Sequence, residues 1–273
     1  MMEKVLLLGG TREARMIAGQ LAERDDCKAI LSLAGVTSSP PETGLEKRIG
    51  GFGGAEKMAA WMQDEAITTL IDATHPYAAR ISANAAWAAE KTGIRRLCLS
   101  RPQWQPEDGD QWQEFDDWSA LAAAIPDGAR VFLTAGQDGI TALAAAGSEA
   151  KSQEKSQAKY QEKFGQNRFE LIARALENPR ALENPGENAG ENAGENAGIT
   201  FIKGLPGKHW QDEAALLTDH AITHLVAKNS GGTSSRAKLV AARHLGVPVL
   251  LLARPAPPPP PLYEDVETLM QAL

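Results

Sequence analysis

The chain has 273 residues, 43% hydrophobic and 23% charged, a composition typical of a globular protein with one large or two medium domains. Its formal net charge of −7 argues against nonspecific nucleic-acid binding, which depends on basic side chains that neutralise phosphates. No apolar run approaches the roughly 20 residues that span a bilayer, and the two cysteines, Cys27 and Cys98, are expected to be reduced core thiols of a cytoplasmic protein.

Strand and helix patterns alternate through the first hundred residues. Lys4 is followed by only four apolar residues before Gly9, which is too short for the apolar region of a signal peptide and predicts a first strand. The expected strands are residues 5–8, 29–33, 69–73 and 95–99, and the expected helices are residues 14–22, 55–63 and 77–91. Repeated strand–helix units of this kind predict an α/β fold with a parallel, doubly wound sheet in an N-terminal domain of residues 1–100.

The alternation resumes after an expected linker at residues 101–106 and predicts a second domain of residues 107–254. Its expected strands are residues 131–135, 169–173, 199–203, 225–227 and 247–252, and its expected helices are residues 117–124, 140–146, 212–219 and 234–245. Residues 151–167 and 177–198 hold few large apolar side chains and are expected to be polar insertions. Residues 255–273 are expected to form a proline-rich spacer and a short C-terminal helix.

The first candidate site lies where the first strand ends. Gly9, Thr11 and Ala14 occupy the positions of the three glycines in the dinucleotide-binding fingerprint, two of them replaced by small residues. Such a loop can turn tightly, approach a pyrophosphate and direct helix N–H groups at it. The pattern predicts that a nucleotide contacts the loop formed by Gly9, Gly10, Thr11, Arg12 and Glu13.

A second glycine-rich loop, Gly50 to Gly54, precedes the second helix. Four glycines in five positions are unfavourable in backbone entropy unless something must come close, so Gly51, Phe52 and Gly53 are candidate cofactor contacts. An ordinary loop is the alternative.

A third loop follows the strand at residues 69–73. Asp72 is expected to be nearly buried, with Thr74, His75 and Tyr77 facing the crevice at the strand ends. His75 could donate a proton to a substrate or cap the following helix.

The second domain has a counterpart in Lys228-Asn229-Ser230-Gly231-Gly232, which also follows a predicted strand. A lysine, two polar side chains and two glycines can form an anion cradle. The spacing is not that of a Walker loop, so ATP is not indicated.

Together these motifs resemble the precorrin-6A reductase family of cobalamin (vitamin B12) biosynthesis. The motifs that carry the resemblance are Gly9-Gly10-Thr11-x-Glu13-Ala14-Arg15, Gly50-Gly51-Phe52-Gly53-Gly54, Asp72-Ala73-Thr74-His75-Pro76, Arg101-Pro102-x-Trp104, Lys228-Asn229-Ser230-Gly231-Gly232 and the stretch from Ala237-Lys238-Leu239 to Pro248-Val249. The resemblance implies two Rossmann-like domains with parallel sheets and an inter-domain cleft for the macrocycle.

The resemblance also implies an oxidoreductase that transfers a hydride from a nicotinamide cofactor to a double bond of the tetrapyrrole precorrin-6A, giving precorrin-6B. In that setting His75 and Tyr77 are the catalytic candidates. The cofactor candidates are the three N-terminal loops, including Asp72 and Thr74. The loop that begins at Lys228 is assigned to the polycarboxylate substrate, together with Lys238. No metal, nucleic acid or membrane is expected to bind, and neighbouring pathway enzymes are candidate partners for substrate hand-over.

The end of the second strand favours NADPH over NADH. An NAD-preferring fold usually has an acidic residue there, whereas this chain has Ser32, Gly35, Thr37 and Ser38 and no acid. Ser32, Thr37, Ser38 and Ser39 could donate hydrogen bonds to a 2′-phosphate, and Arg12 could supply charge. Family members have Arg where this chain has Val36.

Two alternatives stay open at this point. One is the NADH-dependent reduction of the cobalt-containing macrocycle in the anaerobic pathway. The other is a nucleotide-binding regulatory module without turnover.

Overall fold

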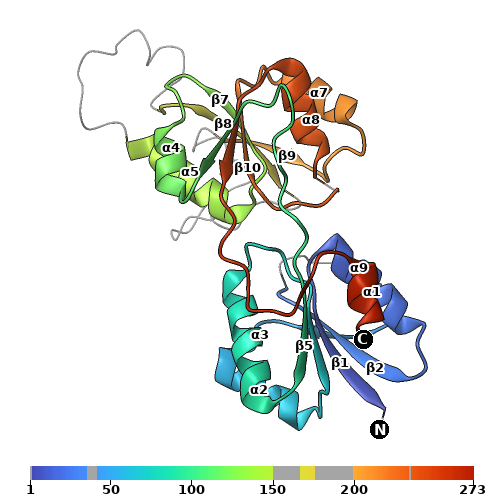
Figure 1. The fold of residues 1–273 in the computed structure, drawn as a ribbon. Coiled ribbons are helices and arrows are strands. Elements are labelled where there is room, and N and C mark those ends of the chain that lie inside the picture. The colour runs from blue at the N-terminus through green and yellow to red at the C-terminus, as the bar shows by residue number, and fades with distance from the viewer. Residues whose placement is uncertain (1, 36–41, 150–166, 176–198, 234) are drawn as a thin grey trace. The chain divides into compact units, whose positions relative to one another are not determined.

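The computed structural model describes residues 2–35, 42–149, 167–175, 199–233 and 235–273 (Figure 1). The chain divides into two compact units, Met1–Gln103 with Arg254–Leu273 and Trp104–Ala253. Each unit contains a six-stranded sheet in which every strand pairing is parallel. The expected α/β class with two parallel sheets is therefore confirmed. The two predicted insertions lie outside the described residues, apart from Asn167.

The first unit has the strand order β12-β5-β4-β1-β2-β3. Its strands are β1 (Glu3–Leu8), β2 (Cys27–Leu33), β3 (Glu46–Ile49), β4 (Thr69–Asp72), β5 (Arg95–Leu99) and β12 (Leu262–Tyr263), and its helices are α1 (Arg12–Ala22), α2 (Ala55–Asp64), α3 (Ala79–Thr92) and α9 (Val266–Gln271). The direction of strand succession reverses between β1 and β4, because β1 leads to β2 and β3 on one side and β4 leads to β5 on the other. Open parallel sheets bind ligands at the carboxyl ends of the strands that flank such a reversal.

Helices cover both faces of this sheet, which explains the uninterrupted apolar run of β1 (Figure 1). Val5 and Leu7 pack into a core cluster with residues of α1 and α9. Leu6 and Leu8 point to the opposite face and pack with residues of α2 and α3. Successive side chains of a strand alternate between faces, so each residue of this run is buried.

The second unit has the strand order β6-β11-β10-β7-β8-β9. Its strands are β6 (Trp112–Phe115), β7 (Arg130–Leu133), β8 (Glu170–Ala175), β9 (Ile199–Lys203), β10 (His224–Lys228) and β11 (Val249–Leu252), and its helices are α4 (Trp118–Ala123), α5 (Gln137–Glu149), α7 (Trp210–Asp219) and α8 (Ala237–Leu245). Here the succession reverses between β7 and β10. Trp104, expected to lie in a linker, is buried in the core of this unit, so the linker ends before it.

The two sheets have the same strand order when β1 to β5 are matched with β7 to β11, but their sixth strands come from unexpected parts of the chain. The strand beside β5 is β12, from the C-terminal stretch, and the strand beside β11 is β6, which follows β5 in sequence. The stretch 255–273 is therefore more than a spacer and a helix, because Leu262 and Tyr263 pair with Cys98 and Leu99.

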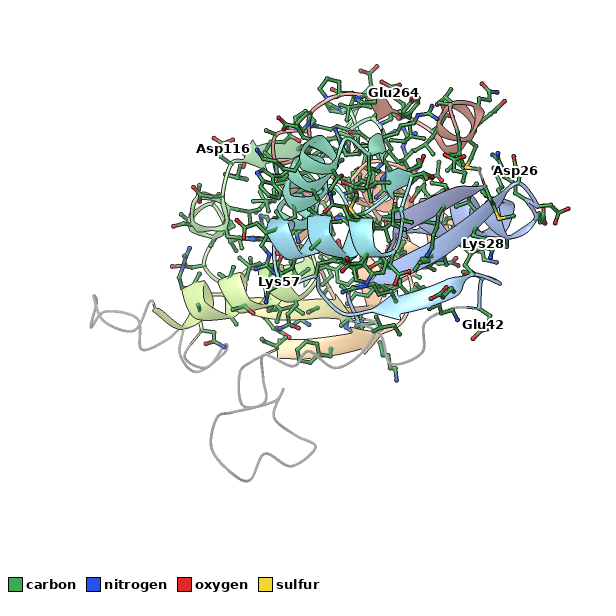
Figure 2. All side chains as sticks on the ribbon, turned by 90° about the horizontal axis from the view of Figure 1, so that it is seen from below. Asp26, Lys28, Glu42, Lys57, Asp116 and Glu264 are labelled. Carbon is green, nitrogen blue, oxygen red and sulfur yellow. The ribbon has the colours of Figure 1, made fainter. Side chains whose placement is uncertain are left out.

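All six charged side chains that Figure 2 labels are exposed. Asp26 and Lys28 flank Cys27 at the start of β2, where the strand turns the thiol inward. Cys27 and Cys98 are both buried and free, as expected for core thiols.

Candidate functional site

The loop between β1 and α1 is held against the end of β4 by Thr11. The Thr11 hydroxyl accepts a hydrogen bond from the Ala14 N–H at 3.0 Å, which caps α1, and donates to the Ala73 carbonyl at 2.7 Å. Gly10 has a φ of +114°, a conformation that favours glycine. A Cβ on Gly9 would lie 2.7 Å from the Leu31 side chain, so this position also needs a small residue.

The second glycine loop follows β3 and is braced by Arg48. The Arg48 guanidinium donates to the carbonyls of Gly50 and Gly51 at 2.7 and 3.1 Å. The same group lies 3.7 Å from the centre of the Phe52 ring, a cation–π distance. These contacts restrain the backbone of a segment that its glycines would otherwise make conformationally flexible.

The third loop is organised by Asp72, which is 1% exposed. Its carboxylate accepts hydrogen bonds from the Thr74 N–H at 3.1 Å and the Thr74 hydroxyl at 2.7 Å. The Cys98 thiol lies 3.9 Å from the same carboxylate. Burial first, and then the nearby Asp72 charge, raises the pKa of Cys98 to about 12, which leaves it a protonated, inert thiol.

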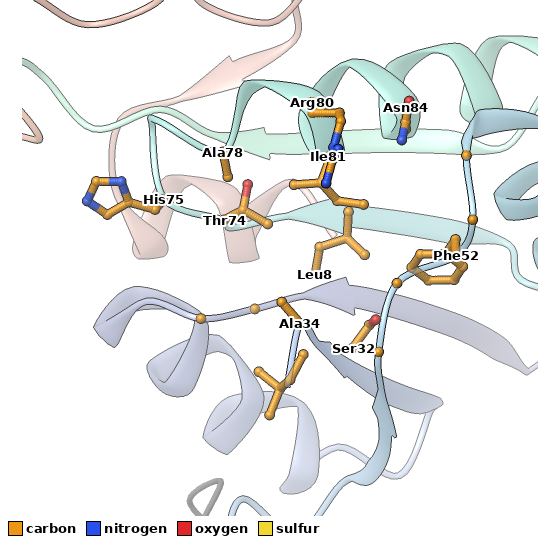
Figure 3. A pocket seen from close by; sticks show the side chains of 17 residues that line it. Leu8, Ser32, Ala34, Phe52, Thr74, His75, Ala78, Arg80, Ile81 and Asn84 are labelled. Carbon is orange, nitrogen blue, oxygen red and sulfur yellow. The ribbon is translucent and has the colours of Figure 1, made fainter. Parts of the chain in front are cut away.

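The three loops surround one pocket of about 690 Å³ over the strand ends of the first unit (Figure 3). Its volume is within the range of pockets that hold small molecules and cofactors. Among the described lining residues none is acidic, and Arg80 is the one with a permanent positive charge. Figure 3 shows the Arg80 side chain reaching from α3 towards Leu8 at the end of β1. The pocket therefore suits an anionic ligand.

Several predicted cofactor residues line this pocket, and several do not. Those that line it are Gly9, Gly10, Ser32, Gly51, Phe52, Gly53 and Thr74, and the catalytic candidate His75 lines it as well. Thr11, Gly35 and Asp72 are not among its lining residues, and Arg12 is exposed on the first turn of α1. Glu13 instead forms an ion pair with Arg101 at 2.5 Å, so its carboxylate is directed to a protein partner. Thr37, Ser38 and Val36 lie outside the described residues.

The pocket also contains residues that sequence reasoning missed. Arg80, Ile81 and Asn84 come from the first turns of α3. Their spacing places them on one face of a helix that begins at a predicted site loop. This shared helical face is the sequence pattern from which the three residues could have been predicted.

The two catalytic candidates occupy different positions. His75 lines the large pocket and a second one of about 260 Å³, which is also lined by Ser100 and Arg254. Its Nδ1 accepts a hydrogen bond from the Tyr77 N–H at 3.3 Å. Tyr77 does not line either pocket, and its ring lies 5.6 Å from the His75 ring, centre to centre.

In the second unit, the predicted anion cradle after β10 is largely a clamp on Trp104. The Asn229 side chain accepts from the Trp104 N–H at 2.9 Å and donates to the Trp104 carbonyl and to Glu114 at 3.2 and 2.6 Å. The Trp104 indole N–H donates to the Gly232 carbonyl at 2.7 Å. The Asn229 amide is thus hydrogen-bonded within the unit, and its assignment to the substrate stays a prediction.

The rest of this loop is also tightly held. Ser230 and Gly231 are buried, and the Lys228 ammonium lies 3.3 Å from the Asp138 carboxylate. That ion pair joins the segment after β10 to the first turn of α5, which follows β7. It therefore spans the two strand ends at which the succession of this sheet reverses.

Lys238, which was also predicted to bind substrate, is buried in the second unit. The residue is 5% exposed and its ammonium lies 5.8 Å from the centre of the Trp104 ring. Burial lowers the pKa of Lys238 to about 8, although the nearby Glu213 carboxylate opposes the shift. The assignment of Lys238 to the substrate stays a prediction.

The stability of the protein should rise as the pH is raised from about 8 to 10.5, the ordinary pKa of lysine. Between these values the unfolded chain binds a proton at Lys238 that the folded chain has released, so higher pH favours folding. Urea unfolding at a series of pH values measures the effect. A Lys238→Met variant should lose this rise, and equal slopes for the two proteins would contradict the assignment.

The chain is similar to known proteins over nearly its whole length. The profile of a family described as precorrin-6x reductase CbiJ/CobK matches residues 4–273. A precorrin-6A reductase of Rhodococcus erythropolis is 37% identical over 273 residues, covering 100% of this chain and 96% of the relative. One of Rhodobacter capsulatus is 36% identical over 270 residues, covering 98% and 95%.

A solved structure described as CobK precorrin-6A reductase superposes with a TM-score of 0.81 at 34% identity, covering 99% of this chain and 96% of its own. In the described part of the chain, no helix has the length and apolar character needed to cross a membrane.

Proposed function

Because the chain belongs to the precorrin-6x reductase family, we propose that it reduces precorrin-6A to precorrin-6B, with NADPH bound in the pocket of the first unit. The observation that carries the choice of site is the pocket itself. Three strand-end loops line it, two of them rich in glycine, and the lining has a permanent positive charge at Arg80 and no acidic side chain among the described residues.

The residues present fit such a dinucleotide. Gly9 and Gly10 allow its pyrophosphate to approach the backbone where α1 begins, and the helix start favours negative charge. Arg80 would add a counter-charge from the facing helix. The bound nicotinamide would supply the hydride, and the protein would orient it and stabilise developing charge.

Saturating a carbon–carbon double bond also requires a proton. His75 is the candidate donor, because it lines the pocket and carries an ionisable ring. Lys228 is the candidate contact for a substrate carboxylate, since it has a positive charge at a strand end of the second unit.

The test of the proposed reaction is a cofactor-oxidation assay with purified protein and either the metal-free or the cobalt-containing macrocycle. We expect turnover with metal-free precorrin-6A. Turnover with the cobalt form alone would assign the chain to the anaerobic reaction. Nucleotide binding without turnover of either macrocycle would favour the regulatory module.

Substituting valine for Gly51 should weaken NADPH binding about tenfold, or by about 1.4 kcal/mol. Gly51 lines the pocket, its φ is outside the left-handed region, and no heavy atom lies within 4 Å of a Cβ built on it. The new side chain would therefore enter the space meant for the ligand without straining the fold. Fluorescence titration with NADPH measures the change.

Gly19→Ala is the matched control. Gly19 is exposed on α1, and a Cβ there also meets nothing within 4 Å. This substitution should leave NADPH affinity unchanged and stabilise the helix by up to about 1 kcal/mol. Unchanged affinity in the Gly51→Val variant would contradict the site.

The catalytic efficiency with NADPH should exceed that with NADH. The described end of β2 presents Ser32 to the pocket and no carboxylate, so a 2′-phosphate would meet no repulsion. The measurement is the ratio of kcat/KM for the two cofactors under one set of conditions. A ratio at or below one would show that the phosphate is not recognised.

A further inference from the structure

Arg48 lies beside the position that usually decides between NADH and NADPH. It is directly opposite Ser32 in the register of β2 and β3, and Ser32 lines the pocket near the end of β2. In dinucleotide-binding sheets this strand end faces the adenosine ribose, and an arginine nearby accommodates a 2′-phosphate. Arg48 does not itself line the pocket, so its influence has to pass through the residues that it contacts.

Those residues are the glycines of the second loop. Arg48 donates to the Gly50 and Gly51 carbonyls at 2.7 and 3.1 Å, and its guanidinium stacks on Phe52. A trans peptide holds its carbonyl and N–H on opposite sides. The N–H groups of Gly51 and Phe52 must therefore point away from Arg48, in residues that line the pocket.

The surroundings of Arg48 lack an anionic partner. Within the described residues, its hydrogen bonds go to carbonyl groups, and no ion pair with a carboxylate is formed. Burial lowers the pKa of Arg48, which shows that the guanidinium is partly withdrawn from water. A desolvated cation behind two fixed peptide groups makes their outward N–H groups better anion donors.

We propose that Arg48 is a positioning residue that orients the Gly51 and Phe52 N–H groups to bind the 2′-phosphate of NADPH. This inference rests on the proposed nucleotide pocket and adds the group that selects between the two cofactors. Arg80 acts on the opposite wall and serves the phosphates that NADPH and NADH share.

Two nucleotide fragments test the inference without the substrate or the nicotinamide ring. The full chain is titrated calorimetrically with adenosine 2′,5′-bisphosphate and with 5′-AMP, which lacks only the 2′-phosphate. The Arg48→Ala variant should bind the bisphosphate about tenfold more weakly and 5′-AMP with nearly unchanged affinity. The Arg48→Lys variant should recover part of the loss, because an ammonium can hold one of the two carbonyls but cannot bridge both as the planar fork does.

Arg24→Ala is the control for loss of a positive charge, since Arg24 lies in the same unit, pairs with Asp26 and is remote from the pocket lining. It should affect neither ligand. Thermal unfolding of each variant shows whether the fold is retained.

The outcomes separate the inference from the function on which it rests. Equal weakening of both ligands would show that Arg48 supports the loop in general, and no weakening would show that it has no part in binding; either result overturns the inference. Equal affinities of the unaltered protein for the two ligands would overturn it while leaving the pocket intact. If the unaltered protein binds neither fragment nor NADPH, the proposed pocket itself fails.

Discussion

The His75→Asn variant should turn over about 100-fold more slowly than the unaltered enzyme, with nearly the same affinity for NADPH. His75 lines the pocket, and its Nδ1 accepts from the Tyr77 N–H at 3.3 Å. This contact leaves Nε2 as the ring nitrogen that can face the substrate, and the imidazolium form of the ring is the acid that would deliver a proton from it. Asparagine can still accept the hydrogen bond from the Tyr77 N–H, so the local backbone turn should be kept. It cannot act as an acid at neutral pH, so the variant lacks the proposed proton donor.

Single-turnover rates across a range of pH are the measurement. The unaltered enzyme should lose rate as a histidine deprotonates, and the asparagine variant should lack that limb of the profile. Tyr77→Phe, which removes a hydroxyl and keeps the ring, is the matched comparison. Loss of rate in Tyr77→Phe with none in His75→Asn would identify the Tyr77 phenol as the proton donor and contradict the assignment of His75.

The Glu213→Ala variant should lose about 3–5 kcal/mol of the free energy of unfolding. Glu213 is 1% exposed, and its carboxylate contacts Arg174 at 2.8 and 3.0 Å and the Gly207 N–H at 2.6 Å. It also lies near the buried Lys238 ammonium. Truncation leaves two buried cations without their shared counter-ion, and no nearby solvent can replace it.

Urea unfolding gives the free energies, with Glu90→Ala as control, because Glu90 is exposed on α3 and should change stability by no more than about 0.5 kcal/mol. Glu213→Gln should be intermediate, since an amide can still accept from Gly207. A loss below about 1 kcal/mol in Glu213→Ala would mean that the cations find other compensation.

The strands that the sequence predicted are chiefly the inner ones, and those that it missed lie at sheet edges. Inner strands such as β1 and β11 contain uninterrupted apolar runs because helices cover both of their faces. β3, β6 and β12 have a neighbour on one side only and carry exposed or charged residues, for example Glu46 and Gln113. Such strands form because a partner strand is present, and that partner can be far away in sequence.

In the site, too, local sequence patterns could be predicted, whereas contacts between distant segments could not. The loop after β1 could be predicted because a turn after an apolar strand is a local pattern, and the loop at Gly50 could be predicted because its glycines are clustered in the sequence. The burial of Asn229 and Lys238 could not be predicted in this way, because both contact Trp104, which is more than a hundred residues earlier in the chain. Arg80 was missed because its approach to the pocket depends on how α3 packs over strand ends formed by other segments.

The origin of β12 has a consequence for synthesis on the ribosome. Multidomain chains usually fold from the N-terminus as they emerge. Here the strand that completes the first sheet lies within the last dozen residues, whereas the second unit, residues 104–253, contains all six of its own strands. The second unit is thus the first whose sheet can be finished, and the first unit reaches its full complement of strands only after the whole of the second unit has been synthesised.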